Sequence, residues 1–91
     1  MSIKAQRINY YKEDDLLYIS FRAGKKPVAS ESLPGIYWRY EEDTNELVGI
    51  TILDFDDYWR SHLDDLANEL NSRLNTGKNN VRYMLEKRLN R

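Results

Sequence analysis

The chain of 91 residues contains a single histidine, His62, and its imidazole is the side chain best suited by type to acid–base chemistry near neutral pH. Helical spacing would place Asp65 and Asp57 close to the ring, so that His62 could act as a general base or as a metal ligand. A zinc site or an activated nucleophile needs further histidine or cysteine partners, and the sequence has neither. We therefore expect His62 to lie on a helix surface, and we predict no catalytic site, no metal and no cofactor.

A second candidate for chemistry is a set of carboxylates in two acidic stretches. If the first turn of the chain and the start of the first helix lie at the same end of the sheet, these oxygens could bind a hard cation. Their spacing does not match a calcium loop, however, and turn formation and helix capping account for each of them. The set comprises Glu13, Asp14, Asp15, Asp54, Asp56 and Asp57.

Aromatic side chains beside a basic residue form a third candidate, in the segment Tyr37-Trp38-Arg39-Tyr40. Aromatic rings with basic neighbours on a strand can stack on nucleic-acid bases. Tyr10, Tyr11 and Tyr18 would add to such a surface. The alternative is that the rings form cross-strand packing pairs, and we favour it because the segment that follows is acidic.

The element that must position these residues is a sheet built around Leu47–Leu53. This run is apolar on both of its alternating faces, which is typical of a central strand. Shorter alternating stretches, separated by turn residues, precede it, and their tight connections indicate an antiparallel meander of about five strands. The expected strands cover residues 7–11, 16–21, 28–33, 36–40 and 47–53, so that the sheet occupies residues 7–54, with 28–33 at its edge.

After Asp54 the apolar period changes from two to between three and four, which predicts an amphipathic helix over residues 56–76. Asp56 or Asp57 would be its N-cap, and Gly77 would take the left-handed C-cap position. A second, short, basic helix is expected over residues 80–90. The predicted fold is therefore α+β, with one long and one short C-terminal helix after the sheet. The apolar stripe of the first helix comprises Trp59, Leu63, Leu66, Ala67, Leu70 and Leu74.

Length and composition indicate one domain of modest stability, covering residues 1–91. The chain has no cysteine and no apolar run long enough to span a membrane, and Met1-Ser2-Ile3-Lys4 lacks the apolar stretch of a signal peptide. We therefore expect a soluble, cytoplasmic protein without membrane contact. The charge is uneven, at +3 over residues 1–40, −8 over 41–75 and +4 over 76–91. Such patches either bind a protein or nucleic acid or are solvated surface alone.

The chain contains, in this order, the stretches Tyr10–Phe21, Gly35-Ile36, Tyr40–Asp43 and Leu47–Asp54. Over roughly residues 8–56, this order resembles DUF2283, a family of small bacterial and archaeal proteins of unknown function. The family's final strand usually contains Gly-Ile-Glu-Ile-Leu-Asp, and this chain has Thr51 where that glutamate stands. Lys12 likewise stands where the family usually has aspartate. The resemblance implies no established activity, but some members are thought to lie beside small toxin genes, which implies an antitoxin-like role.

The expected function is that of a non-enzymatic protein-interaction module, antitoxin-like, which binds a small basic protein. The alternative is a nucleic-acid-binding regulator that uses the basic C-terminal helix, and a small hydrolase is a more distant third. For the alternative, the expected nucleic-acid contacts are Lys78, Arg82, Lys87, Arg88 and Arg91.

The central strand also predicts a homodimer. A helix over residues 58–74 can cover only one face of the sheet, so the other face needs a different cover. An isologous contact solves this, because one patch then covers its own copy. The expected partner or dimer contacts are Trp38, Tyr40, Leu47, Leu53, Val81, Met84, Leu85 and Leu89.

Overall fold

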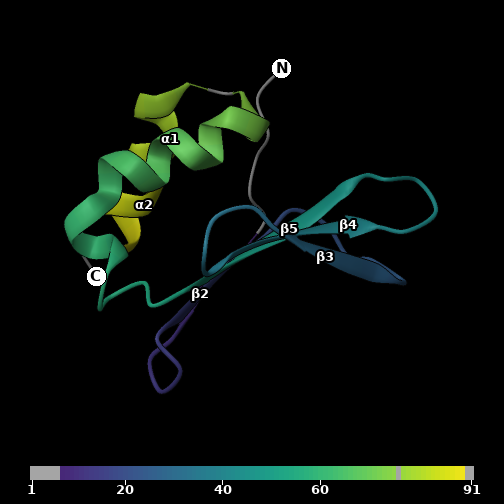
Figure 1. Ribbon diagram of the computed structural model, residues 1–91, viewed down its shortest axis with the longest axis horizontal. Coiled ribbons are helices and arrows are strands. Elements are labelled where there is room, and N and C mark those ends of the chain that lie inside the picture. The colour runs from purple at the N-terminus through teal and green to yellow at the C-terminus, as the bar shows by residue number, and fades with distance from the viewer. Residues whose placement is uncertain (1–6, 76, 90–91) are drawn as a thin grey trace. The chain divides into compact units, whose positions relative to one another are not determined.

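The computed structural model describes residues 7–75 and 77–89, without the side chains of Lys78, Arg88 and Leu89. The chain groups into two compact units (Figure 1). In its described part, the first unit runs from Arg7 to Asp57 and contains the sheet. The second runs from Tyr58 to Leu89 and contains the helices.

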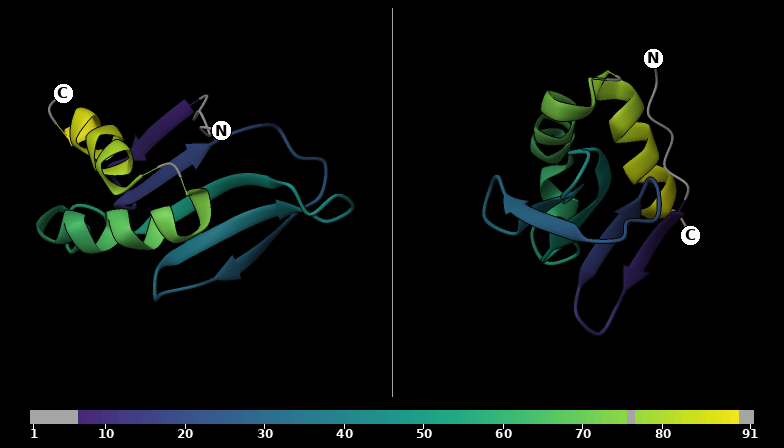
Figure 2. Two further views of the ribbon diagram at one scale, coloured as in Figure 1. Left: turned by 90° about the horizontal axis from the view of Figure 1, so that it is seen from above. Right: turned by 90° about the vertical axis from the view of Figure 1, so that its right-hand side faces the viewer.

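The first unit is a five-stranded antiparallel sheet, as predicted, with the order β1-β2-β5-β4-β3. The last strand along the chain, β5, lies in the middle and pairs with β2 on one side and β4 on the other. A strict meander would place β3 beside β2, but here β5 separates the two hairpins. Figure 2 shows β1 at one margin of the sheet and β3 at the other. The strands are β1 (Arg7–Tyr11), β2 (Leu16–Ser20), β3 (Pro27–Glu31), β4 (Ile36–Glu41) and β5 (Leu47–Leu53).

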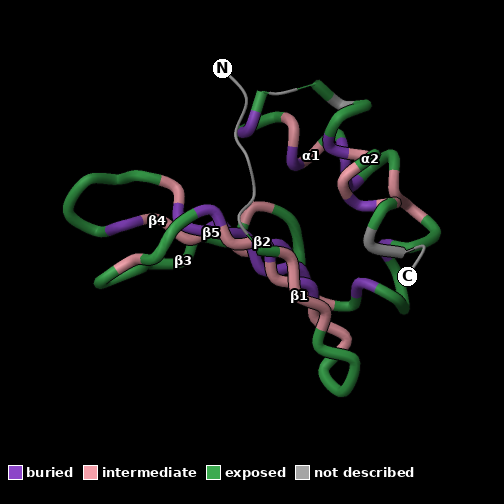
Figure 3. The backbone as a smooth tube through the Cα atoms, turned by 180° about the vertical axis from the view of Figure 1, so that it is seen from behind, coloured by how far each residue is buried: buried purple, intermediate pink, exposed green. Residues whose placement is uncertain are grey.

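The two faces of the sheet differ in polarity, because the register places residues of like polarity opposite each other on neighbouring strands. On the first face, apolar residues of β2, β5 and β4 lie in adjacent rows, and β5 is buried along most of its length (Figure 3). The pairing of Ile19 with Ile50, and of Ile50 with Trp38, shows how the core crosses the sheet. The side chains on this face with no exposed surface are Leu17, Ile19, Ile36, Trp38, Ile50 and Ile52.

Turn residues connect the strands as their chemistry predicts. Asp15, at the end of the first turn, and Asn45, before β5, both have a positive φ, of 50° and 61°. Short polar side chains tolerate this region better than most residues do. Gly35 has a φ of 88° in the Pro34-Gly35 turn before β4, where the N–H of Ile36 donates to the carbonyl of Leu33 at 2.9 Å. These connections fix the alternation of side chains in the strands that follow.

The second unit contains two helices of equal length. A four-residue 3₁₀ turn (Trp59–His62) leads into α1 (Leu63–Leu74), and α2 (Lys78–Leu89) follows; each α-helix has 12 residues. The two helices pack against each other (Figure 2). The apolar stripe expected in the first helix is confirmed in α1, where Leu66, Ala67, Leu70 and Leu74 are buried. None of the described helices is long and apolar enough to cross a bilayer.

Both predicted caps of the first helix were wrong. Helical structure starts at Trp59, after Asp56 and Asp57, and neither the 3₁₀ turn nor α1 has a side-chain N-cap hydrogen bond. At the other end, the left-handed C-cap is Asn75, with φ 54° and its N–H bonded to the carbonyl of Asn71. Gly77 also has a positive φ, of 104°, and lies just before α2. The left-handed cap therefore falls on an asparagine, which adopts this conformation more readily than other non-glycine residues.

Candidate functional site

The second face of the sheet carries polar and aromatic side chains, and they cover the central strand. The ring of Tyr18 lies over Gly49, so that a Cβ atom on residue 49 would come within 2.8 Å of the phenol oxygen. Two residues further along the same face of β5, the Oγ1 of Thr51 accepts a hydrogen bond from the Nε of Arg39 at 3.0 Å. Gly49 and Thr51 are both buried. This face of β5 is therefore covered by its neighbouring strands, and the premise that it needs another cover was wrong.

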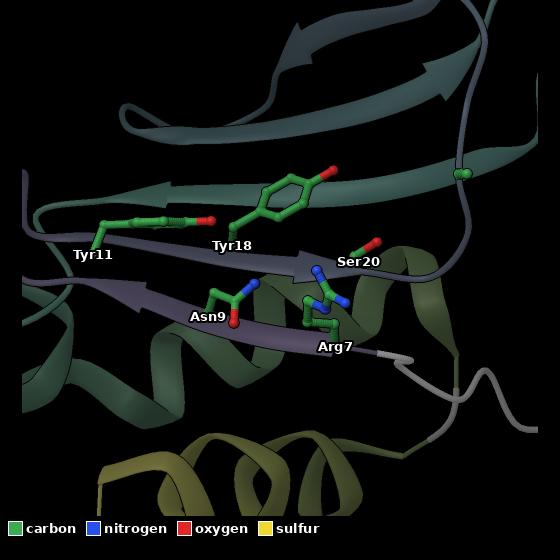
Figure 4. A pocket seen from close by; sticks show the side chains of 6 residues that line it. Arg7, Asn9, Tyr11, Tyr18 and Ser20 are labelled. Atoms are coloured by element: carbon green, nitrogen blue, oxygen red, sulfur yellow. The ribbon is translucent and has the colours of Figure 1, made fainter.

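A groove lies beside this covered region, along β1 and β2. It has a volume of about 380 Å³. Side chains of β1 and β2 line it on the second face of the sheet (Figure 4). Because β-strand side chains alternate, Ile8 and Tyr10 of β1 and Leu17 and Ile19 of β2 belong to the first face. The lining residues are Arg7, Asn9, Tyr11, Tyr18, Ser20 and Ala23.

The chemistry of the groove favours hydrogen-bond acceptors as ligands. Its lining offers the guanidinium of Arg7, the amide of Asn9 and the hydroxyls of two tyrosines and Ser20. No carboxylate lines it, and no ion pair involves Arg7 within the described part of the chain. Tyr11 is half exposed, at 50%, so its ring is open to a ligand. The groove therefore presents one positive charge and several groups that can donate hydrogen bonds.

A tyrosine–glutamate pair lies on the same face, at the far margin. Tyr37 of β4 pairs with Glu31 of β3 in the register, and the two side chains share a hydrogen bond. This hydrogen bond, together with the negative charge of Glu31, raises the pKa of Tyr37 above its ordinary value of 10.0. Glu31 also accepts a hydrogen bond from the N–H of Gly35 at 3.1 Å. Tyr37 is thus held as a neutral phenol beside a structural carboxylate.

Asp15 connects the two acidic stretches, as a hydrogen-bond acceptor. Its carboxylate accepts the N–H of Asp56 at 2.7 Å and the N–H of Asp57 at 3.0 Å, and it also accepts the hydroxyl of Tyr10 at 2.8 Å. Asp56 and Asp57 therefore contribute their backbone, where the sequence suggested side-chain caps. The first turn and this segment meet at one end of the sheet, which is the condition that a cation site would require, but the contact is made through backbone N–H groups. Over the described residues, no three acidic or histidine side chains form a group that could hold a metal.

A second carboxylate has a similar structural role that the sequence did not reveal. Glu41, at the end of β4, is only 7% exposed and accepts the N–H of Lys25 at 2.9 Å and of Lys26 at 3.2 Å. It anchors the connection between β2 and β3. Strict alternation predicts that Glu41 lies on the polar face of its strand, but a β-bulge between Arg39 and Tyr40 interrupts the alternation, and the fold brings a loop 15 residues earlier against the Glu41 carboxylate.

His62 has a local role at the junction before α1. Its ring stacks on that of Tyr58, with the centroids 4.1 Å apart and the planes 7° from parallel. Its Nδ1 lies 2.8 Å from the carbonyl oxygen of Tyr58, and because a carbonyl only accepts, this nitrogen carries the proton. The ring is partly exposed, as expected for a residue at a helix boundary.

The residues predicted to contact a partner fall into two groups. Trp38, Val81 and Leu85 are at most 2% exposed, so they lie in the interior of the chain. Tyr40, Leu47, Leu53 and Met84 are partly exposed, and Leu47 and Leu53 mark the two ends of β5. The side chain of Leu89 lies outside the described part. None of these residues lines the groove. The groove could not be predicted from the sequence, because Arg7, Asn9 and Ser20 come together only through the pairing of β1 with β2.

The predicted nucleic-acid contacts are only partly described. Arg82 forms ion pairs with Asp64 of α1 and with Glu86, whose Oε1 is 2.6 Å from the arginine Nε. The hydrogen bond to Glu86, followed by that to Asp64, raises the pKa of Arg82 above its ordinary value. The Nζ of Lys87 lies 5.6 Å from the centre of the Tyr83 ring. The side chains of Lys78 and Arg88, and all of Arg91, lie outside the described residues.

Fold and face together define a small α+β protein whose sheet has an apolar face and a polar, tyrosine-bearing face with a groove. Residues 7–55, more than half of the chain, match the family described as protein of unknown function (DUF2283). The chain belongs to this family, as its strand motifs predicted. No curated protein and no solved structure matches it.

Proposed function

We propose that this protein is a non-enzymatic interaction module that binds a small protein partner through the groove face of its sheet. The observation that carries the proposal is the groove itself, in which Arg7, Tyr11 and Tyr18 are held on two paired strands. Tyrosine and arginine are the residue types that most often carry binding energy at protein interfaces. Because they lie on strands, these side chains are positioned before the partner arrives.

The polarity of the groove indicates which part of the partner enters it. A segment with carbonyl or carboxylate groups would find the guanidinium of Arg7 and several hydroxyl donors. The acidic segment 41–75 supports a basic partner less strongly than its charge of −8 suggests. Three of its carboxylates are already bonded within the chain: Glu41 to backbone N–H groups, Glu46 to Arg22 and Asp64 to Arg82. A basic partner stays a prediction.

We further propose that the module is cytoplasmic and acts like an antitoxin, by binding and masking a small protein. The absence of cysteine fits a reducing compartment. We also propose that the module acts as a homodimer. The support for this assembly comes from the edge strand β1, because the second face of β5 is already covered by the neighbouring strands.

The experiment compares two exposed tyrosines. The tagged parent chain, Tyr11→Ala and Tyr83→Ala are used to capture proteins from the native cells, and mass spectrometry identifies what is retained. Tyr11 is 50% exposed and lines the groove, whereas Tyr83 is 63% exposed on α2 and does not. We expect the parent and Tyr83→Ala to retain the same small protein and Tyr11→Ala to lose it. Equal retention by all three chains would contradict the groove proposal.

The nucleic-acid alternative keeps little support among the described residues. Arg82 is held by two carboxylates, so it would have to leave both ion pairs to contact phosphate. Nuclease treatment of the captured material distinguishes the two proposals, because it would release a partner bound through nucleic acid and leave one bound to the groove.

A further inference from the structure

The two margins of the sheet differ in how they are protected against pairing with another strand. On β3, the N–H of Ser32 donates to the carbonyl of Ile36 at 3.0 Å, so by alternation Ser30 and Val28 face β4. The outward positions are therefore Pro27, Ala29 and Glu31. Proline has no N–H to offer, and a proline at an outward position blunts an edge strand.

The opposite margin, β1, has no proline among its described residues. The N–H of Phe21 donates to the carbonyl of Val48 at 2.8 Å, so alternation turns the backbone groups of Ser20 and Tyr18 towards β1. Their partners Arg7 and Asn9 face β2 in return, and Ile8 directs its N–H and C=O away from the sheet. The strand has the sequence Arg-Ile-Asn-Tyr-Tyr, without proline or lysine. No described strand lies beyond it in the sheet.

We propose that β1 pairs antiparallel with β1 of a second copy of this chain, with the two-fold axis at Asn9. The two sheets then form one continuous sheet of twice the width. This interface rests on the homodimer proposed above, and it shares Arg7, Asn9 and Tyr11 with the groove. Strand addition at an open edge is a common mode of protein association, because main-chain hydrogen bonds supply the contact.

The side chains of β1 fit their own copy in this register. A two-fold axis at Asn9 places Arg7 opposite Tyr11 of the second copy, and Tyr11 opposite its Arg7. A guanidinium over a tyrosine ring is a favourable pair, whereas two arginines opposite each other would repel. The two Asn9 amides meet at the axis, where each can donate and accept.

The same register also joins the two grooves. Arg7, Asn9 and Tyr11 line the groove and lie on β1, so the grooves of both copies meet at the axis. On the first face, Ile8 lies opposite residue 10 of the second copy, and both are partly buried in the single chain. A register centred elsewhere in β1 loses the arginine–tyrosine pairs, which is why we place the axis at Asn9.

Proline substitutions on the two margins test the interface. Ile8→Pro removes an outward N–H on β1, and Ala29→Pro removes an outward N–H on β3, so neither change breaks a hydrogen bond within the sheet. Circular dichroism first establishes that both variants fold. Light scattering at tens of micromolar should then return a dimer mass for the parent and for Ala29→Pro, and a monomer mass for Ile8→Pro. A monomeric parent, or a dimer that persists in Ile8→Pro, would overturn the proposal.

A cysteine at the axis provides a second measurement that does not depend on weakening the dimer. The chain has no cysteine, so Asn9→Cys introduces a single thiol. Residues opposite each other in a non-hydrogen-bonded antiparallel pair have Cα atoms about 4.5 Å apart, within the range that a disulfide can bridge. Mild oxidation should link most of Asn9→Cys into a covalent dimer and leave the matched control, Ala29→Cys, monomeric on a non-reducing gel. Equal cross-linking of the two variants would contradict the placement.

The results also distinguish this interface from the proposed function. Ile8 does not line the groove, so Ile8→Pro should still capture the partner protein that the parent captures. If the parent is a monomer and Tyr11→Ala still loses the partner, the interface is wrong and the groove proposal stands. If the parent is a dimer that Ile8→Pro dissociates and nothing is captured, the interface stands and the groove proposal is wrong.

Discussion

The ring of Tyr18 occupies the space above Gly49 that a side chain would otherwise fill. A Cβ atom at residue 49 would lie 2.8 Å from the Tyr18 hydroxyl oxygen and 2.7 Å from the carbonyl oxygen of Ile19. Glycine in the middle of a strand usually weakens it, so its presence here requires a reason. The reason is close approach: the missing side chain allows Tyr18 to cover the central strand from its neighbour.

This relationship predicts that Gly49→Ala destabilises the sheet. The methyl group meets both a ring and a backbone oxygen, and overpacking of this kind costs about 1–3 kcal/mol. A urea melt monitored by tryptophan fluorescence measures the change in the free energy of unfolding. Tyr18→Ala in the same chain should restore only part of it, because the carbonyl of Ile19 remains in place. An unchanged melt for Gly49→Ala would contradict the observed contact.

Local patterns were sufficient to predict most of the sheet. Alternation in Leu16–Phe21 and the run Leu47–Leu53, apolar on both faces, predicted two of the three inner strands, and the turn residues Asp15 and Asn45 predicted where they begin. The cover of the second face could not be predicted in this way. It depends on which residues the register brings together, such as Tyr18 with Thr51 and Arg39 with Gly49. Register is a property of strand pairs that single-strand patterns leave open.

The carboxylates show the same limit. Asp56 and Asp57 precede a helical pattern, and local chemistry favours them as caps. The fold instead gives their N–H groups to Asp15, 41 and 42 residues earlier in the chain. A contact over that distance depends on the end of β5 returning to the first turn. No local signal distinguishes a capping aspartate from an aspartate whose backbone is itself bound.

The role of Asp15 predicts a graded loss of stability. Asp15→Ala removes an acceptor of two backbone N–H groups and one hydroxyl, and hydrogen bonds to a charged group contribute about 1.5–3 kcal/mol. Asp15→Asn keeps a side-chain oxygen and tolerates the φ of 50°, so its loss should be smaller. Thermal unfolding measures both, with Asp14→Ala as the control on an exposed neighbour. Equal melting temperatures for Asp15→Ala and Asp14→Ala would contradict this role.

The ion pair between Arg22 and Glu46 predicts an effect of pH. The two side chains are 2.5 Å apart, and the hydrogen bond from Arg22 lowers the pKa of Glu46 below its ordinary value of 4.5. Because the pKa is lower in the folded state, the contribution to stability is present above the unfolded value and is lost as the pH falls through the folded value. NMR titration of the Glu46 carboxyl should show the lowered pKa, and Arg22→Ala should raise it. Both side chains are about half exposed, so added salt should reduce the difference.

The basic helix permits a direct test of the nucleic-acid alternative. If its cations contacted duplex DNA, the affinity would fall steeply with salt, with a log–log slope near −0.9 for each phosphate contact. We expect no retained DNA or RNA in a low-salt gel shift of the parent chain. A retained band that Lys87→Glu abolishes, and that the charge-neutral control Tyr83→Ala leaves in place, would favour the regulator over the interaction module.

Leu66 provides the test of the helical unit. It lies in the middle of the apolar stripe of α1 and has no exposed surface, whereas Asn68 on the same helix is exposed. Leu66→Ala should lower the free energy of unfolding by about 2–5 kcal/mol, the range for truncation of a buried leucine. Asn68→Ala should change it by less than about 0.5 kcal/mol, as expected for a surface position. Because α1 belongs to a different compact unit from the sheet, the melt of Leu66→Ala should be monitored by helical circular dichroism and by tryptophan fluorescence together. Coincident transitions would show that the two units unfold cooperatively, and a loss of helix that precedes the fluorescence change would show that they do not.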